Sequence, residues 1–372
     1  MLAQIALSLD VSEFRTCVIS LAGPGPVGDL LARRGVDVRW VDVRRPRTLL
    51  VQLRRFRHIV REFRPDLIQG WMYHGNVAAV LASTMVSRRP PVVWGIRQGL
   101  RDRSTEGLST QLAIKLGARL SRSVAASVYA SSESIPDHHQ IGFNEPLAIA
   151  IANGYDLAYL RPKPDAGMQL RRSLAIPADC VVIGHIARFD PVKNHAGLLD
   201  AAVRVTRAVP SCRFILAGPG VDQHNDQLVS LVDLCGLRGQ VVLLGSWDDI
   251  PQLMSSLDIF CLSSTSEGFP NVLAEASACG IPSVTTDVGE ARAILGEAGH
   301  IVPVNDTDAL SEALIRLAEV PSNVRREIGQ RARERIGLQF SLDEMLRKYR
   351  QLYQQVSGRE REPGDQLISA SS

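Results

Sequence analysis

The chain has 372 residues, of which 45% are hydrophobic and 22% charged, and its formal net charge is +3. This is an ordinary globular composition with enough chain for two domains, and the small net charge excludes a general nucleic-acid binder. No apolar run approaches the roughly 20 residues that a membrane-spanning helix needs, and no signal peptide is visible. The six cysteines form no C-x-x-C pair, which predicts a reduced, cytoplasmic protein without a metal site.

Apolar stretches of strand length alternate with helical patterns along the chain, after a predicted helix at residues 1–10. The first series of predicted strands covers residues 16–21, 36–43, 67–69, 92–94 and 126–129. The second series covers residues 181–187, 213–217, 241–244, 259–262 and 283–286. Continuous apolar strands separated by helices indicate parallel sheets that are covered on both faces. We therefore predict an α/β protein with two doubly wound domains.

The two series are separated by residues 161–167, which have the proline and glycine content of a linker. We predict domains at residues 1–160 and 161–340, followed by an amphipathic helix at 341–356 and a polar, disordered tail at 357–372. Ligands of doubly wound sheets bind at the carboxyl ends of the strands. A cleft between the two sheets is therefore the expected site.

Residues 44–64 hold a local excess of positive charge, with eight arginines and one acid, Glu62. Leu49, Leu53, Phe56, Val60 and Phe63 make an apolar stripe at helical spacing. Two interpretations stay open. The segment is either a surface helix with a solvated basic face, or a surface that docks on anionic lipid headgroups or on a phosphate-bearing lipid acceptor.

Two polar segments follow predicted strands of the first domain. His74 comes shortly after the strand at 67–69, and Arg97 and Gln98 come after the strand at 92–94. We expect these side chains at the cleft. A lone histidine is more often a hydrogen-bonded loop residue than a catalyst, so the role of His74 stays open.

Arg188 and Lys193 follow the first strand of the second domain, where a loop leads into a helix. Fixed cations at such a place stabilise a diphosphate leaving group as its bond to a sugar breaks. The alternative is an ordinary pair of solvated surface residues.

The stretch from Glu267 to Glu275 is the most informative in the chain. The strand at 259–262 runs into a Glu-Gly turn, Pro270 lies just inside a new helix, and Gly280 ends that helix. Free amides at the helix start suit a phosphate, and two carboxylates about two turns apart suit sugar hydroxyls. The pattern predicts a nucleotide-sugar site.

The residues 267–289 resemble the E-x7-E motif of glycosyltransferase family 4, retaining enzymes of the GT-B fold, and Arg188 and Lys193 match that family's diphosphate-binding pair. The resemblance implies two Rossmann-like domains facing across a cleft, with the helix at 341–356 crossing back to the first. It places Glu267 near the donor sugar and Glu275 on the ribose. It also implies the remaining donor-site residues, namely Gly268, Phe269, Pro270, Asn271, Val272, Trp247 at the nucleobase and Asn153 in a hinge turn.

One departure from that family concerns the catalytic histidine. Many members carry a cleft-facing histidine where this chain has Arg97 and Gln98. Either Arg97 takes an electrostatic role or His74 positions the sugar, and the sequence does not decide between them.

The resemblance implies transfer of a sugar, with retention and without a metal or cofactor, from a nucleotide donor to a lipid-linked or polysaccharide acceptor. A UDP-sugar is the expected donor, and envelope or lipopolysaccharide synthesis at the cytoplasmic membrane face is the expected setting. Two alternatives remain, a nucleotide-sugar epimerase of the same fold and a degenerate nucleotide-sugar-binding protein.

A last expectation concerns the predicted helix at residues 1–10. A doubly wound domain normally opens with a strand that is central in its sheet, and family members have such a strand ahead of a helix like this one. We therefore expect that a first strand and a glycine-rich loop precede Met1 in the complete protein. Without them, two inner strands would have unpaired edges.

Overall fold

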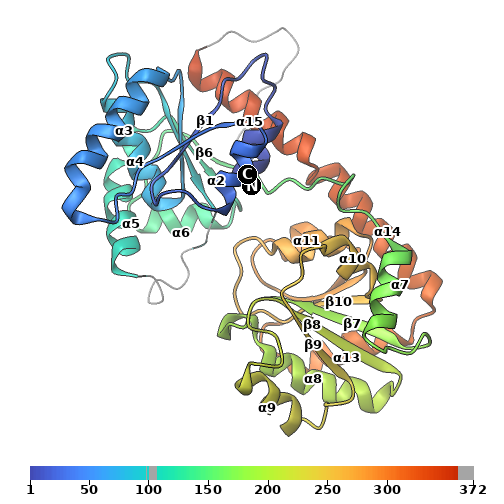
Figure 1. Ribbon diagram of the computed structural model, residues 1–372. Coiled ribbons are helices and arrows are strands. Elements are labelled where there is room, and N and C mark those ends of the chain that lie inside the picture. Colours follow the sequence, from blue (N-terminus) through green and yellow to red (C-terminus); the bar gives the residue numbers. More distant parts are fainter. Residues whose placement is uncertain (98, 100–106, 359–372) are drawn as a thin grey trace. The chain divides into compact units, whose positions relative to one another are not determined.

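The computed structural model describes residues 1–97, 99 and 107–358. Gln98 and the predicted tail beyond residue 358 therefore lie outside the described residues. The chain forms two compact units, one of Met1–Gly154 with Asp343–Ser372 and one of Tyr155–Leu342. Each unit consists of parallel strands with helices packed around them (Figure 1).

Unit 1 contains the elements α1 (Leu2–Ser8), β1 (Cys17–Ser20), α2 (Pro26–Arg33), β2 (Asp37–Trp40), η1 (Pro46–Thr48), α3 (Leu49–Phe63), β3 (Ile68–Trp71), α4 (Met72–Thr84), β4 (Val92–Ile96), α5 (Leu108–Leu120), η2 (Ser121–Ser123), β5 (Ala126–Tyr129), α6 (Ser134–Gln140), β6 (Ala148–Ala150) and α15 (Leu342–Ser357). All five strands predicted for this unit are present, and β6 was not predicted. The predicted helix at residues 1–10 is confirmed as α1, and that at 341–356 as α15.

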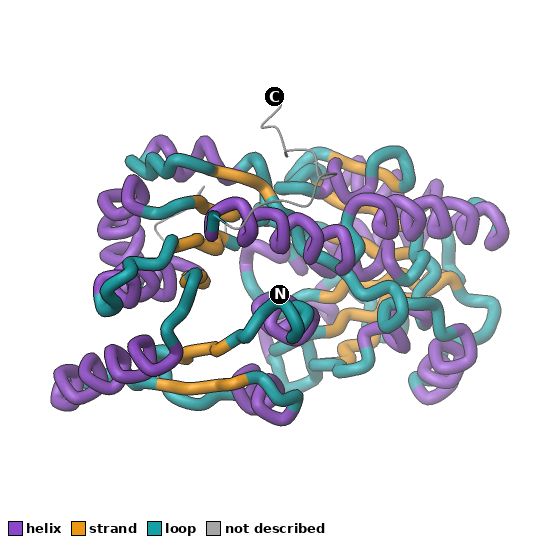
Figure 2. The backbone as a smooth tube through the Cα atoms, turned by 90° about the horizontal axis from the view of Figure 1, so that it is seen from above, coloured by secondary structure: helices purple, strands orange, loops and turns teal. Residues whose placement is uncertain are grey.

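The strands of unit 1 form two sheets that do not pair with each other. One has the order β1-β2 and the other the order β3-β4-β5-β6, and both are parallel. Figure 2 shows the smaller sheet as two strands apart from the rest. In the described residues, β1 pairs with β2 and β3 pairs with β4, and no pairing joins β1 to β3.

Unit 2 contains α7 (Pro164–Ser173), β7 (Val181–Ile186), η3 (Pro191–Lys193), α8 (His195–Ala208), β8 (Cys212–Ala217), α9 (Asp226–Leu234), β9 (Val241–Gly245), α10 (Ile250–Ser255), β10 (Ile259–Leu262), α11 (Asn271–Ala278), β11 (Ser283–Thr286), α12 (Ala291–Leu295), β12 (Gly299–Val302), α13 (Thr307–Glu319) and α14 (Ser322–Gln339). The five predicted strands are present, and β12 is additional. They form one parallel sheet of order β12-β11-β10-β7-β8-β9. Its core side chains, such as Phe214 and Leu198, are fully buried between the sheet and its helices.

The structure divides the chain at Gly154, whereas the linker composition had suggested residues 161–167. The reason is that Tyr155 is tied into unit 2. Its backbone bridges to Ser341, its hydroxyl donates to Asn271 Oδ1 at 2.9 Å, and its ring stacks on Phe269. α15, in turn, packs within unit 1, where the Tyr353 hydroxyl hydrogen-bonds Gln69 on β3.

Candidate functional site

The strand order of unit 2 fixes the place of its site. β7 has β8 on one side and β10 on the other, so the chain changes direction across the sheet between β7 and β10. The loops that follow two such strands diverge and leave a crevice at their carboxyl ends. Residues 187–194 follow β7 and residues 263–270 follow β10. The predicted cations and the first predicted acid therefore lie in adjacent loops.

Lys193 and Glu267 form an ion pair across these two loops. Lys193 Nζ lies 2.5 Å from Glu267 Oε1, and each side chain is only 14% exposed. Ser264 Oγ donates to the same carboxylate oxygen at 2.8 Å. A mostly buried pair of this kind is costly to break, because removing one partner leaves the other charge uncompensated. The acid is therefore held in one position at the carboxyl edge of the sheet.

The two loops are also joined through their backbones. Thr265 N donates to Val192 O at 2.8 Å, and Ser263 Oγ donates to Lys193 O at 2.9 Å. Asn194 adopts a left-handed conformation with φ of 52°, and its side chain caps α8 by accepting from Gly197 N. These contacts fix the backbone from which Lys193 projects. Site residues gain precision when their supporting shell is fixed.

Arg188 lies in the same loop but is more exposed. Its side chain is 60% exposed and lies 3.0 Å from Asp190 Oδ2. The Val192 amide and then Arg188 hold the pKa of Asp190 below its usual value. Asp190 therefore stays ionised at neutral pH and neutralises part of the Arg188 charge. Exposed pairs of this kind are weak, so a phosphate can compete for the guanidinium.

Two buried histidines lie next to Lys193. His185 and His195 have ring centroids 4.8 Å apart, and His185 Nδ1 lies 3.0 Å from Cys261 O. Burial lowers the pKa of His185 to about 3 and that of His195 to about 4. Both imidazoles are therefore neutral at physiological pH, and the sequence had given no reason to consider either of them.

Glu267 and Glu275 lie in different surroundings. Glu275 lies on α11, and burial raises its pKa to about 7. Because folding raises the pKa of Glu275, the protonated side chain contributes to stability at low pH, and this contribution is lost as the pH rises through about 7. A ligand that donates hydrogen bonds to the carboxylate would offset the cost of burying its charge.

The turn between the two acids depends on a close backbone approach. Gly289 has φ of +46°, and a Cβ built on it would lie 2.2 Å from Gly268 O and 2.6 Å from Glu267 O. Glu290 N also donates to Gly268 O at 3.3 Å. The turn thus packs against the loop after β11, and a side chain at position 289 would displace it.

The other predicted donor-site residues differ in their burial and in their contacts. Pro270 precedes α11 as its cap and is not inside the helix as predicted, since the helix begins at Asn271. The Phe269 ring is buried and contacts the rings of Tyr155 and Phe340. Val272 is partly buried, as is Trp247 after β9, whose Nε1 has no partner in the described part of the chain.

The predicted residues of the first domain lie in unit 1. Arg97, just past β4, donates to Ile151 O at 2.9 Å and hydrogen-bonds Asn153 Oδ1, so these two form a clamp at the end of the unit. His74 is exposed on the first turn of α4. In the described residues, no hydrogen bond or ring contact joins His74 to Arg97.

In the described residues, no group of three or more His, Cys, Asp or Glu side chains is arranged to hold a metal ion. Over the same residues, no helix is both long and apolar enough to cross a membrane.

Comparison with protein families identifies the family to which the chain belongs. The model of the group 1 glycosyl transferases matches residues 168–335, and that of the glycosyl transferase 4-like domain matches residues 1–154. The chain belongs to the group 1 glycosyltransferases, as the E-x7-E resemblance predicted.

Individual relatives are more distant. The N-acetyl-α-D-glucosaminyl L-malate synthase of Bacillus anthracis is 28% identical over 190 residues, which are 50% of this chain and 49% of that protein. The UDP-Gal:α-D-GlcNAc-diphosphoundecaprenol α-1,3-galactosyltransferase of Escherichia coli is 26% identical over 214 residues, or 56% of this chain and 54% of that protein. The chain thus spans about half the length of the curated relatives it matches.

Among solved structures, the HepE protein of Anabaena in complex with UDP and glucose is similar over 95% of both chains, with a TM-score of 0.81 and 23% identity. This likeness shows the fold. It is GT-B, with two Rossmann-like domains, as predicted.

Proposed function

We propose that the chain is a retaining glycosyltransferase that transfers a sugar from a UDP-sugar to a lipid-linked or polysaccharide acceptor. The observation that carries the proposal is the Lys193–Glu267 pair at the switch point of unit 2, beside the start of α11. Lys193 and Arg188 supply positive charge for a diphosphate, and the first amides of α11 have no acceptor within the helix. Glu267 and Glu275 supply hydrogen-bond acceptors for hydroxyl groups.

The reaction needs charge stabilisation more than it needs a nucleophile. The bond from the anomeric carbon to the diphosphate oxygen breaks, and its electron pair goes to that oxygen. The acceptor oxygen bonds to the same face of the carbon, and its proton passes to a phosphate oxygen. Lys193 and Arg188 stabilise the charge that develops on the diphosphate. Glu267, already held by Lys193 and Ser264, positions the sugar and does not attack it.

The choice of UDP and of the acceptor rests on the relatives. The Escherichia coli relative is named for a UDP-galactose donor and a diphosphoundecaprenol acceptor, and HepE was solved with UDP. The proposed setting is envelope polysaccharide synthesis at the cytoplasmic face of the membrane.

A panel of UDP-, GDP- and ADP-sugars, in the presence of a chelator, tests the proposal. We expect UDP-sugars to raise the melting temperature, and UDP to be released faster when a polyprenyl-diphosphate sugar is added. Release of an epimerised sugar without acceptor would indicate an epimerase. Binding without any turnover would indicate a binding protein, and either result would replace the proposal.

The basic segment around α3 supports a membrane surface as a further partner. Leu50 and Val51, at the start of α3, are 74% and 61% exposed, although Phe56 and Val60 on the same helix are buried. The exposed arginines Arg47, Arg54 and Arg57 lie within the same segment. An apolar tip among cations is typical of helices that dock on anionic lipid headgroups.

Two other arginines of this segment make contacts within unit 1. Arg55 lies over the Trp40 ring at 4.3 Å, and Arg61 Nε donates to Met85 O at 3.0 Å. Both therefore support the fold, and substituting them would confuse binding with stability.

We expect Arg47, Arg54 and Arg57 changed together to Gln to weaken co-sedimentation with vesicles containing 30% phosphatidylglycerol by about tenfold or more, given about 1 kcal/mol per cation near such a surface. Leu50→Ser with Val51→Ser should weaken it without changing the salt dependence. Changing Arg207, Arg326 and Arg331 of unit 2 to Gln is the matched control. Equal sedimentation of all three variants and the wild type would leave the segment as a solvated face.

A further inference from the structure

The turn of residues 267–271 links Glu267 to the first residue of α11, and we call it the donor turn. Its first end is fixed by the ion pair of Glu267 with Lys193. Its second end carries Phe269, which is buried, and Asn271, which is exposed. A site keeps its geometry only when the residues that support it are themselves fixed. The support of the second end therefore matters as much as that of the first.

Tyr155 contacts the second end of the donor turn in two ways. Its ring stacks on Phe269, with ring centroids 6.4 Å apart and an interplanar angle of 20°. Its hydroxyl donates to Asn271 Oδ1 at 2.9 Å. Tyr155 is only 5% exposed, and a side chain in close-packed surroundings has little freedom to reorient. The hydroxyl therefore ties the first residue of α11 to a ring that is itself fixed.

The backbone of Tyr155 is held on both sides. Tyr155 N donates to Phe340 O and Leu342 N donates to Tyr155 O, both at 2.9 Å. The residue also forms a parallel bridge with Ser341. The Phe340 ring in turn meets Phe269 edge-on, with ring centroids 5.8 Å apart. Tyr155 and the segment after α14 thus form one support, and the donor turn rests on it.

The far end of α11 is tied to the same stretch of chain. Arg333 of α14 donates to the carbonyl oxygens of Leu157 and Leu160 and also to that of Ala278, the last residue of α11. A cation there also interacts favourably with the negative end of the helix dipole. α11 is therefore held at its start by Tyr155 and at its end, through Arg333, by the residues that follow Tyr155.

The choice of partner for the Tyr155 hydroxyl carries the argument beyond stability. A buried tyrosine hydroxyl needs a hydrogen-bond partner, and a nearby backbone carbonyl would satisfy it equally well. Here the partner is the exposed side chain of Asn271, which the sequence resemblance assigns to the donor site. Packing alone would need only the ring. The hydroxyl adds a fixed link from the interior of unit 2 to the start of α11.

We propose that Tyr155 is a positioning residue of the transferase, which holds the donor turn so that Glu267 and the start of α11 meet the donor together. The effect on turnover rests on the proposed function, whereas the effect on the turn rests on the contacts alone. Tyr155 acts through Phe269 and Asn271, and Glu267 precedes Phe269 by two residues. A displacement of about 1 Å at a substrate-positioning group can cost about 100-fold in rate.

Tyr155→Phe removes the hydroxyl and keeps the ring. We expect it to lower turnover per UDP-binding site by about tenfold and to leave UDP affinity within about threefold. The melting temperature should fall by about 2–4 °C, as for the loss of one hydrogen bond in a unit of this size. The number of sites comes from the calorimetric stoichiometry, so a smaller folded fraction does not lower the turnover per site.

Asn271→Ala gives the second half of a double-mutant cycle. If the hydroxyl acts through Asn271, Tyr155→Phe should have no further effect on turnover in the Asn271→Ala background. Equal turnover per site in the wild type and in Tyr155→Phe would overturn the proposal. So would the same tenfold loss in both backgrounds, because the hydroxyl would then act without Asn271.

Hydrogen exchange tests the support of the donor turn without any turnover. We expect the amides of residues 269–274 to exchange about fivefold or more faster in Tyr155→Phe than in the wild type. Unchanged exchange there would contradict the positioning role. If the wild type had no transferase activity but exchange changed as expected, the proposed function would fail and the support of the turn by Tyr155 would stand.

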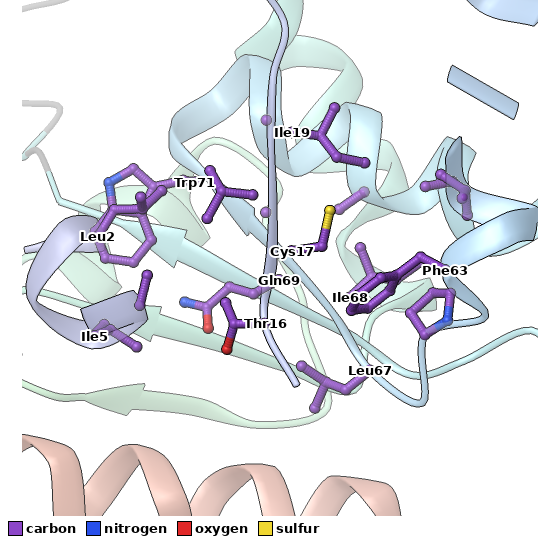
Figure 3. Close-up of a pocket in the computed structure, with 18 of the residues that line it drawn as sticks. Leu2, Ile5, Thr16, Cys17, Ile19, Phe63, Leu67, Ile68, Gln69 and Trp71 are labelled. Atoms are coloured by element: carbon purple, nitrogen blue, oxygen red, sulfur yellow. The ribbon is translucent and has the colours of Figure 1, made fainter. Parts of the chain in front are cut away.

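Two control variants lose a little stability elsewhere. Ser311→Ala removes a buried hydroxyl that donates to Asp308 O on α13 of unit 2. Ile68→Val shortens a side chain that lines a cavity of about 1060 Å³ within unit 1 (Figure 3). Neither variant should speed exchange in the donor turn. If either raised it as much as Tyr155→Phe does, the effect would reflect general destabilisation and the proposal would be wrong.

Discussion

Glu267→Gln should lower turnover of the UDP-sugar by about 100-fold or more while leaving UDP affinity within about threefold. The amide keeps the shape of the side chain but loses the charge that Lys193 and Ser264 hold in place. If Glu267 positions the sugar, removing its charge should raise the free energy of the transition state and leave nucleotide binding nearly unchanged. Turnover by UDP release and UDP affinity by calorimetry, on the same preparations, give the two numbers.

Glu275→Gln is the informative comparison, because we expect the opposite pattern: weaker UDP binding with a smaller effect on turnover at saturation. Glu312→Gln, on the exposed surface of α13, controls for the removal of an acid that pairs with an arginine. If Glu267→Gln weakened UDP binding and Glu275→Gln abolished turnover, the two roles would be the reverse of those proposed.

Lys193→Ala should weaken UDP binding by about 10- to 100-fold, the value of one charge-assisted contact of about 1.5–3 kcal/mol. Arg188→Ala should have a smaller effect, because Arg188 is 60% exposed and shares its charge with Asp190. Arg238→Ala, which breaks an exposed pair with Asp233 on α9, is the matched control. Calorimetry with UDP and a chelator measures all three.

A double variant separates two explanations for weaker UDP binding by Lys193→Ala: loss of a contact with the diphosphate, or repulsion by Glu267. Lys193→Ala leaves Glu267 mostly buried without its cation, and an uncompensated carboxylate would itself repel a diphosphate. The double variant Lys193→Ala with Glu267→Gln removes that repulsion. We expect it to bind UDP as weakly as Lys193→Ala. Recovery of wild-type affinity would mean that Lys193 only neutralises Glu267 and does not contact the diphosphate.

Most of the fold could be predicted from the sequence because its strands are apolar and regularly separated by helical patterns. β6 was missed because it has only 3 residues, and β12 (Gly299–Val302) because it contains a glycine and a histidine. The resemblance also assigned Glu267 and Lys193 to one donor site, and they lie in adjacent loops. Their direct ion pair could not be predicted, because the two residues are 74 positions apart in the chain and meet only where β7 and β10 are neighbours in the sheet.

Supporting residues were the harder part of the site. The role of Ser264 could not be predicted from the sequence, because its hydrogen bond to Glu267 depends on the turn geometry. The motif places Phe269 in the donor site, but it did not predict that the ring contacts Tyr155 and Phe340. A motif gives the order of residues along the chain, whereas the direction of each side chain is set by tertiary packing.

The buried histidines have a consequence for how the site responds to acidity. With pKa values of about 3 and 4, His185 and His195 carry no charge anywhere in the physiological range. Glu275, with a pKa of about 7, changes its charge within that range. Cellular acidification would thus reach this site through the proposed ribose acid and not through the two histidines.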